Sequence, residues 1–184
     1  MKDERFDVEY YKNNFDLYNT EYNYFLRFAS KKTLEKFNVK TCGGGEFENC
    51  PIIKLNEKSF LIRNLIYKNR PKYLFQGNVS NQSFFSINNF VDENKPVIVC
   101  EGLSFFLWLA DNNYNALCLL GTQFNTRMYE ILKQFKSDIY IIPDDDNAGR
   151  CCRNRFKGLF KNAKERFLKE NSIEKFIEVA GDLK

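Results

Sequence analysis

Histidine is absent from this chain of 184 residues, and its absence narrows the chemistry that the protein can perform. A Ser-His-Asp or Cys-His nucleophilic site needs an imidazole to accept the proton of the nucleophile, so both kinds of site are excluded. Histidine general bases and histidine-ligated metals are excluded for the same reason. Any catalysis must therefore use carboxylates, lysines, tyrosines or thiols.

Paired cysteine motifs and long apolar runs are also missing. The six cysteines form no Cys-x-x-Cys pair, so we expect neither a disulfide framework nor a zinc site in this chain. No apolar run approaches the ~20 residues of a membrane-spanning helix, and the N-terminus is charged where a signal peptide is apolar. We therefore expect a folded, cytoplasmic protein without a membrane partner, whose 43% hydrophobic content is sufficient for a core.

Positive charge is concentrated in two stretches of the sequence. Residues 54–72 contain six basic residues and one acid, and residues 150–169 contain eight basic residues and one acid. Such clusters favour a polyanionic ligand, because lysine and arginine neutralise phosphates. A solvated helix face or loop is the alternative explanation for each cluster taken alone.

The polar segment 91–96 ends in proline and precedes a β-branched run, so we place a domain boundary near Lys95. The two expected domains are residues 1–95 and residues 96–184. In the second, apolar strands alternate with amphipathic or apolar helices. The strands are expected at 97–100, 116–120, 138–143 and 177–179, and the helices at 103–110, 124–135 and 152–167. This order predicts an α/β fold with right-handed crossovers and a mainly parallel sheet flanked by helices.

The first domain is expected to be a smaller α+β subdomain. Its apolar spacing predicts two short helices, at 24–28 and 34–37, and a small hairpin with strands at 52–55 and 59–63. The three glycines at 43–45 lack the Gly-Lys-Ser/Thr ending of a phosphate-binding loop, so we interpret them as a turn.

Carboxylates follow two of the expected strands directly. Glu101 comes after the strand at 97–100, and Asp144 and Asp146 come after the strand at 138–143. Side chains alternate along an extended backbone, so Asp144 and Asp146 should point the same way and Asp145 elsewhere. In open α/β sheets the functional residues gather at the carboxyl ends of the strands. Helix capping or loop composition is the alternative for each acid alone, but their joint placement favours a site for Mg²⁺, or Mn²⁺ in its place.

The stretches V-I-V-C-E-G, N-A-L-C-L-L-G-T-Q and I-Y-I-I-P-D-D-D-N-A-G-R resemble the Toprim domain of DnaG-type primases, topoisomerases and several nucleases. The likeness covers about residues 96–179. The earlier stretches F-L-R-F-A-S-K-K-T-L-E-K-F-N-V, F-L-I-R-N-L and R-P-K-Y-L are similar to the segment before Toprim in DnaG-like primases.

The resemblance implies a DNA primase that uses nucleoside triphosphates and Mg²⁺ to make short RNA primers on single-stranded DNA during replication, with a replicative helicase as an expected partner. Glu101, Asp144 and Asp146 would be the catalytic and metal-binding residues. Template and nucleotide binding is assigned to the following residues: Arg63, Arg70, Lys72, Tyr73 and Arg150. For Tyr73, core packing is the alternative to base stacking.

Two other functions remain open at the level of sequence. A Toprim nuclease would use the same acids to cleave phosphodiester bonds. A degenerate Toprim module would bind only nucleic acid or a helicase, and Phe105 favours it because primases often carry an acid at this place in the Glu-Gly motif.

Overall fold

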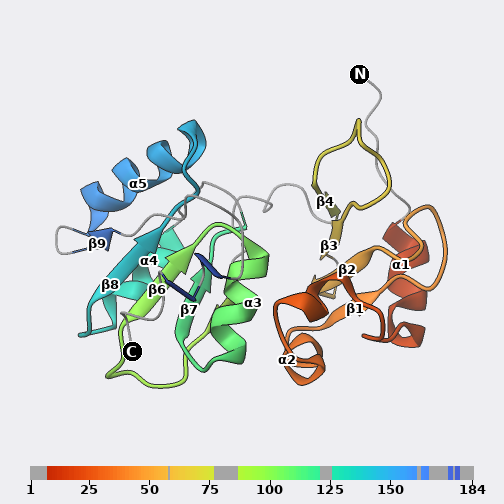
Figure 1. Ribbon diagram of the computed structural model, residues 1–184, viewed down its shortest axis with the longest axis horizontal. Helices are drawn as coiled ribbons and strands as arrows, with labels where there is room; N and C mark the ends of the chain where they lie inside the picture. The colour runs from red at the N-terminus through yellow and green to blue at the C-terminus, as the bar shows by residue number, and fades with distance from the viewer. Residues whose placement is uncertain are drawn as a thin grey trace. The chain divides into compact units, whose positions relative to one another are not determined.

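The computed structural model describes residues 8–57, 59–76, 87–120, 126–160, 163–165, 174–175 and 177–178, and the statements below concern these residues. The chain divides into two compact units, Met1–Gln82 and Ser83–Lys184, each with its own sheet (Figure 1). The division falls before the boundary expected near Lys95. The reason is that β5 (Ile87–Asn89) pairs with the second sheet.

The first unit is built around an antiparallel sheet with the strand order β1-β2-β3-β4. Both predicted helices and the predicted hairpin are present. The elements in chain order are α1 (Val8–Asn14), the 3-10 helices η1 (Phe15–Leu17) and η2 (Tyr24–Arg27), α2 (Lys31–Lys36), β1 (Val39–Thr41), β2 (Pro51–Asn56), β3 (Ser59–Arg63) and β4 (Tyr73–Gln76).

The predicted glycine turn packs closely against α1. Gly45 has a φ of 78°, and a Cβ at this position would lie 2.6 Å from Cε1 of the Tyr10 ring. Glycine tolerates both the positive φ and the close contact, so the turn needs it. Beside the turn, the buried residues Tyr11, Phe47 and Phe60 form part of the core of this unit.

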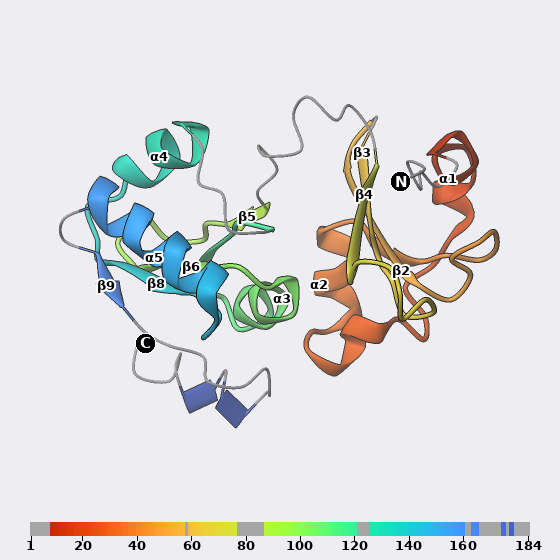
Figure 2. The same cartoon turned by 90° about the horizontal axis from the view of Figure 1, so that it is seen from above.

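Among the described residues, the second unit has a five-stranded sheet in the order β5-β7-β6-β8-β9, and only β5 runs antiparallel to its neighbour. Figure 2 labels β5, β6, β8 and β9 of this unit. The predicted mainly parallel sheet flanked by helices is therefore confirmed. Its remaining elements are β6 (Val97–Cys100), α3 (Leu103–Asp111), β7 (Asn115–Cys118), α4 (Thr126–Lys133), β8 (Ile139–Ile142), α5 (Asn147–Leu159) and β9 (Lys164–Glu165).

The C-terminal part differs from the expectation. The strand predicted at 177–179 is wrong for its described residues, because Ile177 and Glu178 are helical, while residue 179 lies outside the description. An ion pair between Lys175 and Glu178, three residues apart, fits one helical turn. Helix α5 ends at Leu159 instead of continuing towards residue 167, with glycine in its last turn. Within the described part of the chain, no helix has the length and apolar character needed to cross a bilayer.

Helices α4 and α5 pack on the same face of the second sheet. Met128 from α4 and Phe156 from α5 are both fully buried in one cluster with alternate residues of the strands, such as Val97 and Val99. Helix α3 contributes no residue to this cluster and packs against β6 and β7. Since side chains alternate between the two faces of a strand, α3 covers the opposite face.

A single buried amide fixes the segment that leads into β6. Asn115 is fully buried at the start of β7, and its Oδ1 accepts the backbone N–H groups of Val91 and Asp92 at 2.7 and 3.1 Å. Its Nδ2 donates to the carbonyls of Asp92 and Lys95. These four hydrogen bonds satisfy the buried amide and attach residues 91–95 to the second unit.

Candidate active site

The three predicted catalytic acids meet at one edge of the second sheet. Strands β6 and β8 are parallel neighbours, with Cys100 opposite Ile142. Glu101 follows β6 directly, and Asp144 and Asp146 follow β8 after a single proline. The carboxyl ends of parallel strands lie at the same edge, so the topology brings the three acids together from separate parts of the sequence.

The electrostatics of Glu101 show that the acids lie close to one another. Its pKa is raised to about 7, first by burial and then by the negative charges of Asp144 and Asp146. A hydrogen bond from the backbone of Asp144 and another from the thiol of Cys152 act in the opposite direction. Among the described residues, Oε1 of Glu101 has no hydrogen-bond partner although it is buried. The site therefore concentrates negative charge around one unsatisfied oxygen.

The three consecutive aspartates have different surroundings. Asp144 is partly buried and Asp146 is exposed, and both act on Glu101. Asp146 is also the N-cap of α5, since its Oδ1 accepts the backbone N–H of Gly149 at 2.7 Å. Asp145 is exposed and lies 3.6 Å from the guanidinium of Arg150. The negative charges of Asp144 and Asp146 thus influence Glu101, whereas Asp145 pairs with Arg150.

Gly149 allows the aspartate loop to pack against the start of α5. A Cβ at Gly149 would lie 2.0 Å from the carbonyl oxygen of Asp144, closer than any side chain can approach. Gly102, by contrast, has an ordinary φ of −87° and open space around its Cα. The backbone at Gly102 is one that other residues also adopt, so this position does not require glycine.

Three cysteines surround Glu101, and sequence reasoning missed them as part of this site. Cys100 and Cys118 lie opposite each other on β6 and β7, and the thiol of Cys118 donates to the backbone carbonyl of Glu101 at 3.4 Å. Burial raises the pKa of Cys152, which contacts the Glu101 carboxylate, to about 12, so the thiol stays protonated as a donor. The sequence signal was weak, since Cys100 ends its predicted strand whereas Cys118 stands in the middle of the strand predicted at 116–120.

The carboxylates of Glu101, Asp144 and Asp146 are of the chemical type that binds a hard divalent cation, although they are not arranged as a complete metal site. In the described part of the chain, no three carboxylate or thiol side chains are arranged to hold a metal ion as they stand. The fit comes from the chemistry of the site, because carboxylate oxygens are the preferred ligands of Mg²⁺ and the buried Oε1 of Glu101 lacks a partner. Carboxylate rotation, with substrate phosphates and water as further ligands, would complete the coordination.

The raised pKa of Glu101 predicts how stability depends on pH in the absence of divalent ions. The folded protein retains a proton between pH 4.5 and about 7 that the unfolded chain has released, so the free energy of unfolding should fall as the pH rises through this range. The expected loss is on the order of 1 to 3 kcal/mol. Urea unfolding at several pH values in EDTA measures it. Glu101→Gln should flatten the profile, and an unchanged slope in this variant would contradict the assignment.

Two of the predicted nucleic-acid contacts lie on neighbouring strands of the first unit. Arg63 on β3 is paired in register with Tyr73 on β4, and its guanidinium lies 4.9 Å from the centre of the Tyr73 ring. The same guanidinium lies 5.5 Å from the ring of Tyr24 and donates to the carbonyl of Lys72 at 3.3 Å. Its Nε is buried with no hydrogen-bond partner among the described residues. Aromatic rings thus hold a cation in place on this sheet.

The other predicted basic residues have different settings. Arg70 forms an ion pair with Glu46 and lies 4.5 Å from the centre of the Tyr67 ring, so this residue also has a structural role. Lys72 and Arg150 are exposed, and Arg150 lies in the first turn of α5 beside the aspartate loop. The positive charge of Arg150 at the helix N-terminus is compensated locally, since its guanidinium lies 3.6 Å from Asp145 and donates to Oδ1 of Asn147.

Sequence reasoning also missed two residues next to Arg63. The guanidinium of Arg27 lies 5.2 Å from the ring centre of Tyr24, and both residues belong to η2. Arg27 is exposed, and Tyr24 is partly exposed. We refer to Tyr24, Arg27, Arg63 and Tyr73 together as the cation–aromatic cluster. No sequence pattern indicates this cluster, because η2 and β3 are brought together only by the fold.

Comparison with known proteins gives a family model and a set of structural neighbours. Residues 98–175 match the model described as Toprim-like. No curated protein sequence matches the chain. The solved structures similar to it include primase catalytic cores, and at the identities below the likeness concerns the fold.

The zinc-binding and RNA polymerase domains of the Aquifex aeolicus primase match 97% of this chain with 17% identity and a TM-score of 0.67. The primase fragment of the bacteriophage T7 primase-helicase protein matches 89% of this chain, with 19% identity and a TM-score of 0.56. The DnaG primase catalytic domain bound to single-stranded DNA matches 80% of this chain, with 17% identity and a TM-score of 0.54. This chain covers 60%, 75% and 66% of these three structures, respectively. The resemblance inferred from the sequence is confirmed.

Proposed function

Since this chain has a Toprim-like domain within the fold of DnaG-type primase catalytic cores, we propose that it is a primase-type nucleotidyltransferase. It joins ribonucleotides into short RNA primers on single-stranded DNA. The observation that carries the proposal is the convergence of Glu101, Asp144 and Asp146 at the carboxyl ends of β6 and β8. An α/β sheet concentrates its chemistry at this edge.

In the proposed reaction, the hydroxyl of the growing strand attacks the α-phosphorus of a nucleoside triphosphate, and pyrophosphate leaves. Mg²⁺, when bound, would neutralise charge and orient the phosphates. Asp144 and Asp146 would hold the ion. Glu101 would complete the site or take the proton of the attacking hydroxyl. Arg150, exposed beside the aspartates, pairs with a phosphate.

The template-binding role is proposed for the first unit. Arg63, Lys72 and Tyr73 lie together at the β3–β4 pair, where the arginine and lysine pair with phosphates and the tyrosine stacks on a base. Arg70, which contacts the Tyr67 ring and pairs with Glu46, is a further proposed contact to phosphate. The structural neighbour with bound single-stranded DNA supports this assignment, and the phage primase-helicase neighbour supports a replicative helicase as partner.

A single incubation separates the proposed activity from its rivals. The protein is mixed with single-stranded DNA, the four ribonucleoside triphosphates and Mg²⁺, and the products are resolved by size. Short RNA dependent on the metal is the expected result. Shortened DNA without RNA would show a nuclease. DNA binding without either product would show a non-catalytic module, in agreement with Phe105, which is 1% exposed and packs in the core where primases often carry an acid.

Arg63→Ala should weaken binding of single-stranded DNA about tenfold, because the variant loses a phosphate contact and the cation between Tyr24 and Tyr73. The slope of log affinity against log salt should fall by about 1. Fluorescence anisotropy with a labelled oligonucleotide measures both quantities. Lys12→Ala is the matched control, since Lys12 pairs with Glu9 on α1 of the same unit. Equal losses in both variants would argue against a specific template surface.

A further inference from the structure

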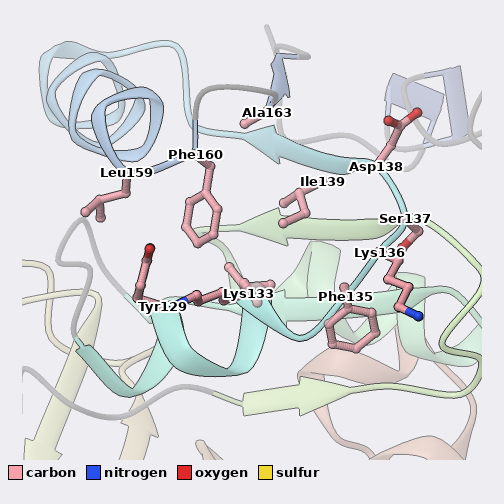
Figure 3. Close-up of a pocket in the computed structure, with 11 residues that line it drawn as sticks. Tyr129, Lys133, Phe135, Lys136, Ser137, Asp138, Ile139, Leu159, Phe160 and Ala163 are labelled. Carbon is pink, nitrogen blue, oxygen red and sulfur yellow. The ribbon is translucent and has the colours of Figure 1, made fainter.

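A cavity of about 350 Å³ lies on the second unit at the end of the sheet opposite to the carboxylates (Figure 3). Asp138 and Ile139 line it at the start of β8, whereas Asp144 follows the end of that strand. The Cα atoms of Asp138 and Asp144 are six residue steps apart along a mostly extended chain, which corresponds to about 20 Å. The cavity is therefore distinct from the proposed active site.

The floor of the cavity is apolar and aromatic. Leu132 of α4 is fully buried, and Ile139 is 9% exposed. Phe160 projects between α4 and β8, and its ring lies 5.2 Å from the ring of Tyr129 (Figure 3). The lining therefore offers an apolar surface to a bulky side chain, in a volume typical of ligand pockets.

The rim of the cavity carries an excess of positive charge. Lys133 and Lys136 are both exposed there. The carboxylate of Asp138, also at the rim, forms an ion pair with Lys164 and is thereby neutralised. An apolar floor below two lysines is complementary to a ligand that combines an apolar group with negative charge.

The polar groups of the cavity favour a peptide over a nucleotide. The hydroxyl of Ser137 donates to the backbone carbonyl of Lys95 at 2.7 Å, and Asp138 is paired with Lys164. The hydroxyl of Tyr129 is the other uncharged polar group of the lining (Figure 3). One hydroxyl is a poor match for a buried nucleobase, which needs several partners for its hydrogen-bonding edges. A phenylalanine or leucine side chain needs none.

We propose that this cavity, the lysine-rimmed pocket, binds a short acidic segment of a partner protein that inserts one large apolar side chain. Carboxylates on either side of that side chain pair with Lys133 and Lys136, and the apolar group packs against Leu132 and Phe160. The proposal is independent of the enzymatic function, because none of these residues belongs to the carboxylate site.

Fluorescence anisotropy with a labelled peptide Glu-Asp-Phe-Asp-Glu tests the proposal on the full chain. Saturable binding is expected, and replacement of the phenylalanine of the peptide by alanine should weaken it at least tenfold. Equal binding of the alanine peptide would overturn the proposal, because it would show attraction by charge alone. Absence of saturable binding up to about 1 mM would also overturn it.

Variants of the protein show whether the peptide binds at the lysine-rimmed pocket. K133E/K136E should weaken the binding at least tenfold, and Ala163→Phe should block it by filling the cavity without a change of charge. Lys157→Glu is the matched control, an exposed lysine of the same unit outside the cavity, and should bind within twofold of the parent. Thermal unfolding verifies that each variant folds. Displacement of the peptide by ATP or by single-stranded DNA, with the same dependence on Lys133 and Lys136, would replace the proposed ligand by a nucleotide or a nucleic acid.

Discussion

Asp144→Asn is expected to reduce Mg²⁺-dependent primer synthesis at least 100-fold while the fold remains intact. The substitution removes one negative charge from the group formed with Glu101 and Asp146 and keeps the size of the side chain. A loss of this size corresponds to about 2.7 kcal/mol of transition-state stabilisation, within the range found when one electrostatic group of an active site is removed. Primer yield at saturating Mg²⁺, with circular dichroism as the check on folding, measures the effect.

Asp145→Asn is the matched control for this variant. Asp145 is the next residue of the same loop, but it is exposed, pairs with Arg150 and does not act on Glu101. Its activity should stay within a few-fold of the parent, since an exposed ion pair contributes little. Full activity in Asp144→Asn, or equal losses in the two variants, would refute the role assigned to Asp144.

Gly149→Ala is expected to cost more in stability than any other single methyl group added to α5. The added Cβ would lie 2.0 Å from the carbonyl oxygen of Asp144, and its neighbour is backbone, which cannot rotate away. The start of α5 or the aspartate loop must move, and we expect a loss of at least about 3 kcal/mol in the free energy of unfolding. Urea unfolding measures the change. Activity should fall as well, because the same loop carries Asp144 and Asp146.

Gly158→Ala provides the comparison within the same helix. A Cβ at Gly158 meets nothing within 4 Å, and alanine favours the helical conformation. Stability should therefore increase, by a few tenths to about 1 kcal/mol. If Gly149→Ala were as stable as the parent, or lost no more stability than Gly158→Ala, the close packing at Gly149 would be disproved.

The sequence predicted the second sheet well because its strands are short apolar runs with clear ends. Val97–Cys100 and Ile139–Ile142 stand between polar or proline-containing segments, and acids follow both. Strand β9 could not be predicted, since Lys164 and Glu165 have no apolar pattern and join the sheet only through pairing with β8. The opposite error occurred at residues 177–178, where we predicted a strand from apolar residues and the structure has a helix.

The candidate site was predictable in its acids but not in its surroundings. Asp144 and Asp146 are two residues apart, and residues two apart in an extended chain point to the same face. This alternation is a local property of the backbone, so it could be predicted from the sequence. The thiol of Cys152 beside Glu101, and the pairing of Arg70 with Glu46, depend on distances between segments far apart in the sequence. The double use of Asp146, as helix cap and as part of the acidic group, follows from the turn geometry and carries no separate sequence signal.

The pairing of β5 with β7 has a consequence for any attempt to isolate the Toprim-like domain. A fragment that begins at residue 96 would lack Ile87–Asn89 and the backbone partners of Asn115, leaving a buried amide unsatisfied. It would also turn β7 into an open edge strand, ready to add a strand from a second molecule and so to aggregate. The folding unit therefore extends upstream of the motifs that carry Glu101 and Asp144, and we expect its first strand to protect the sheet from self-association.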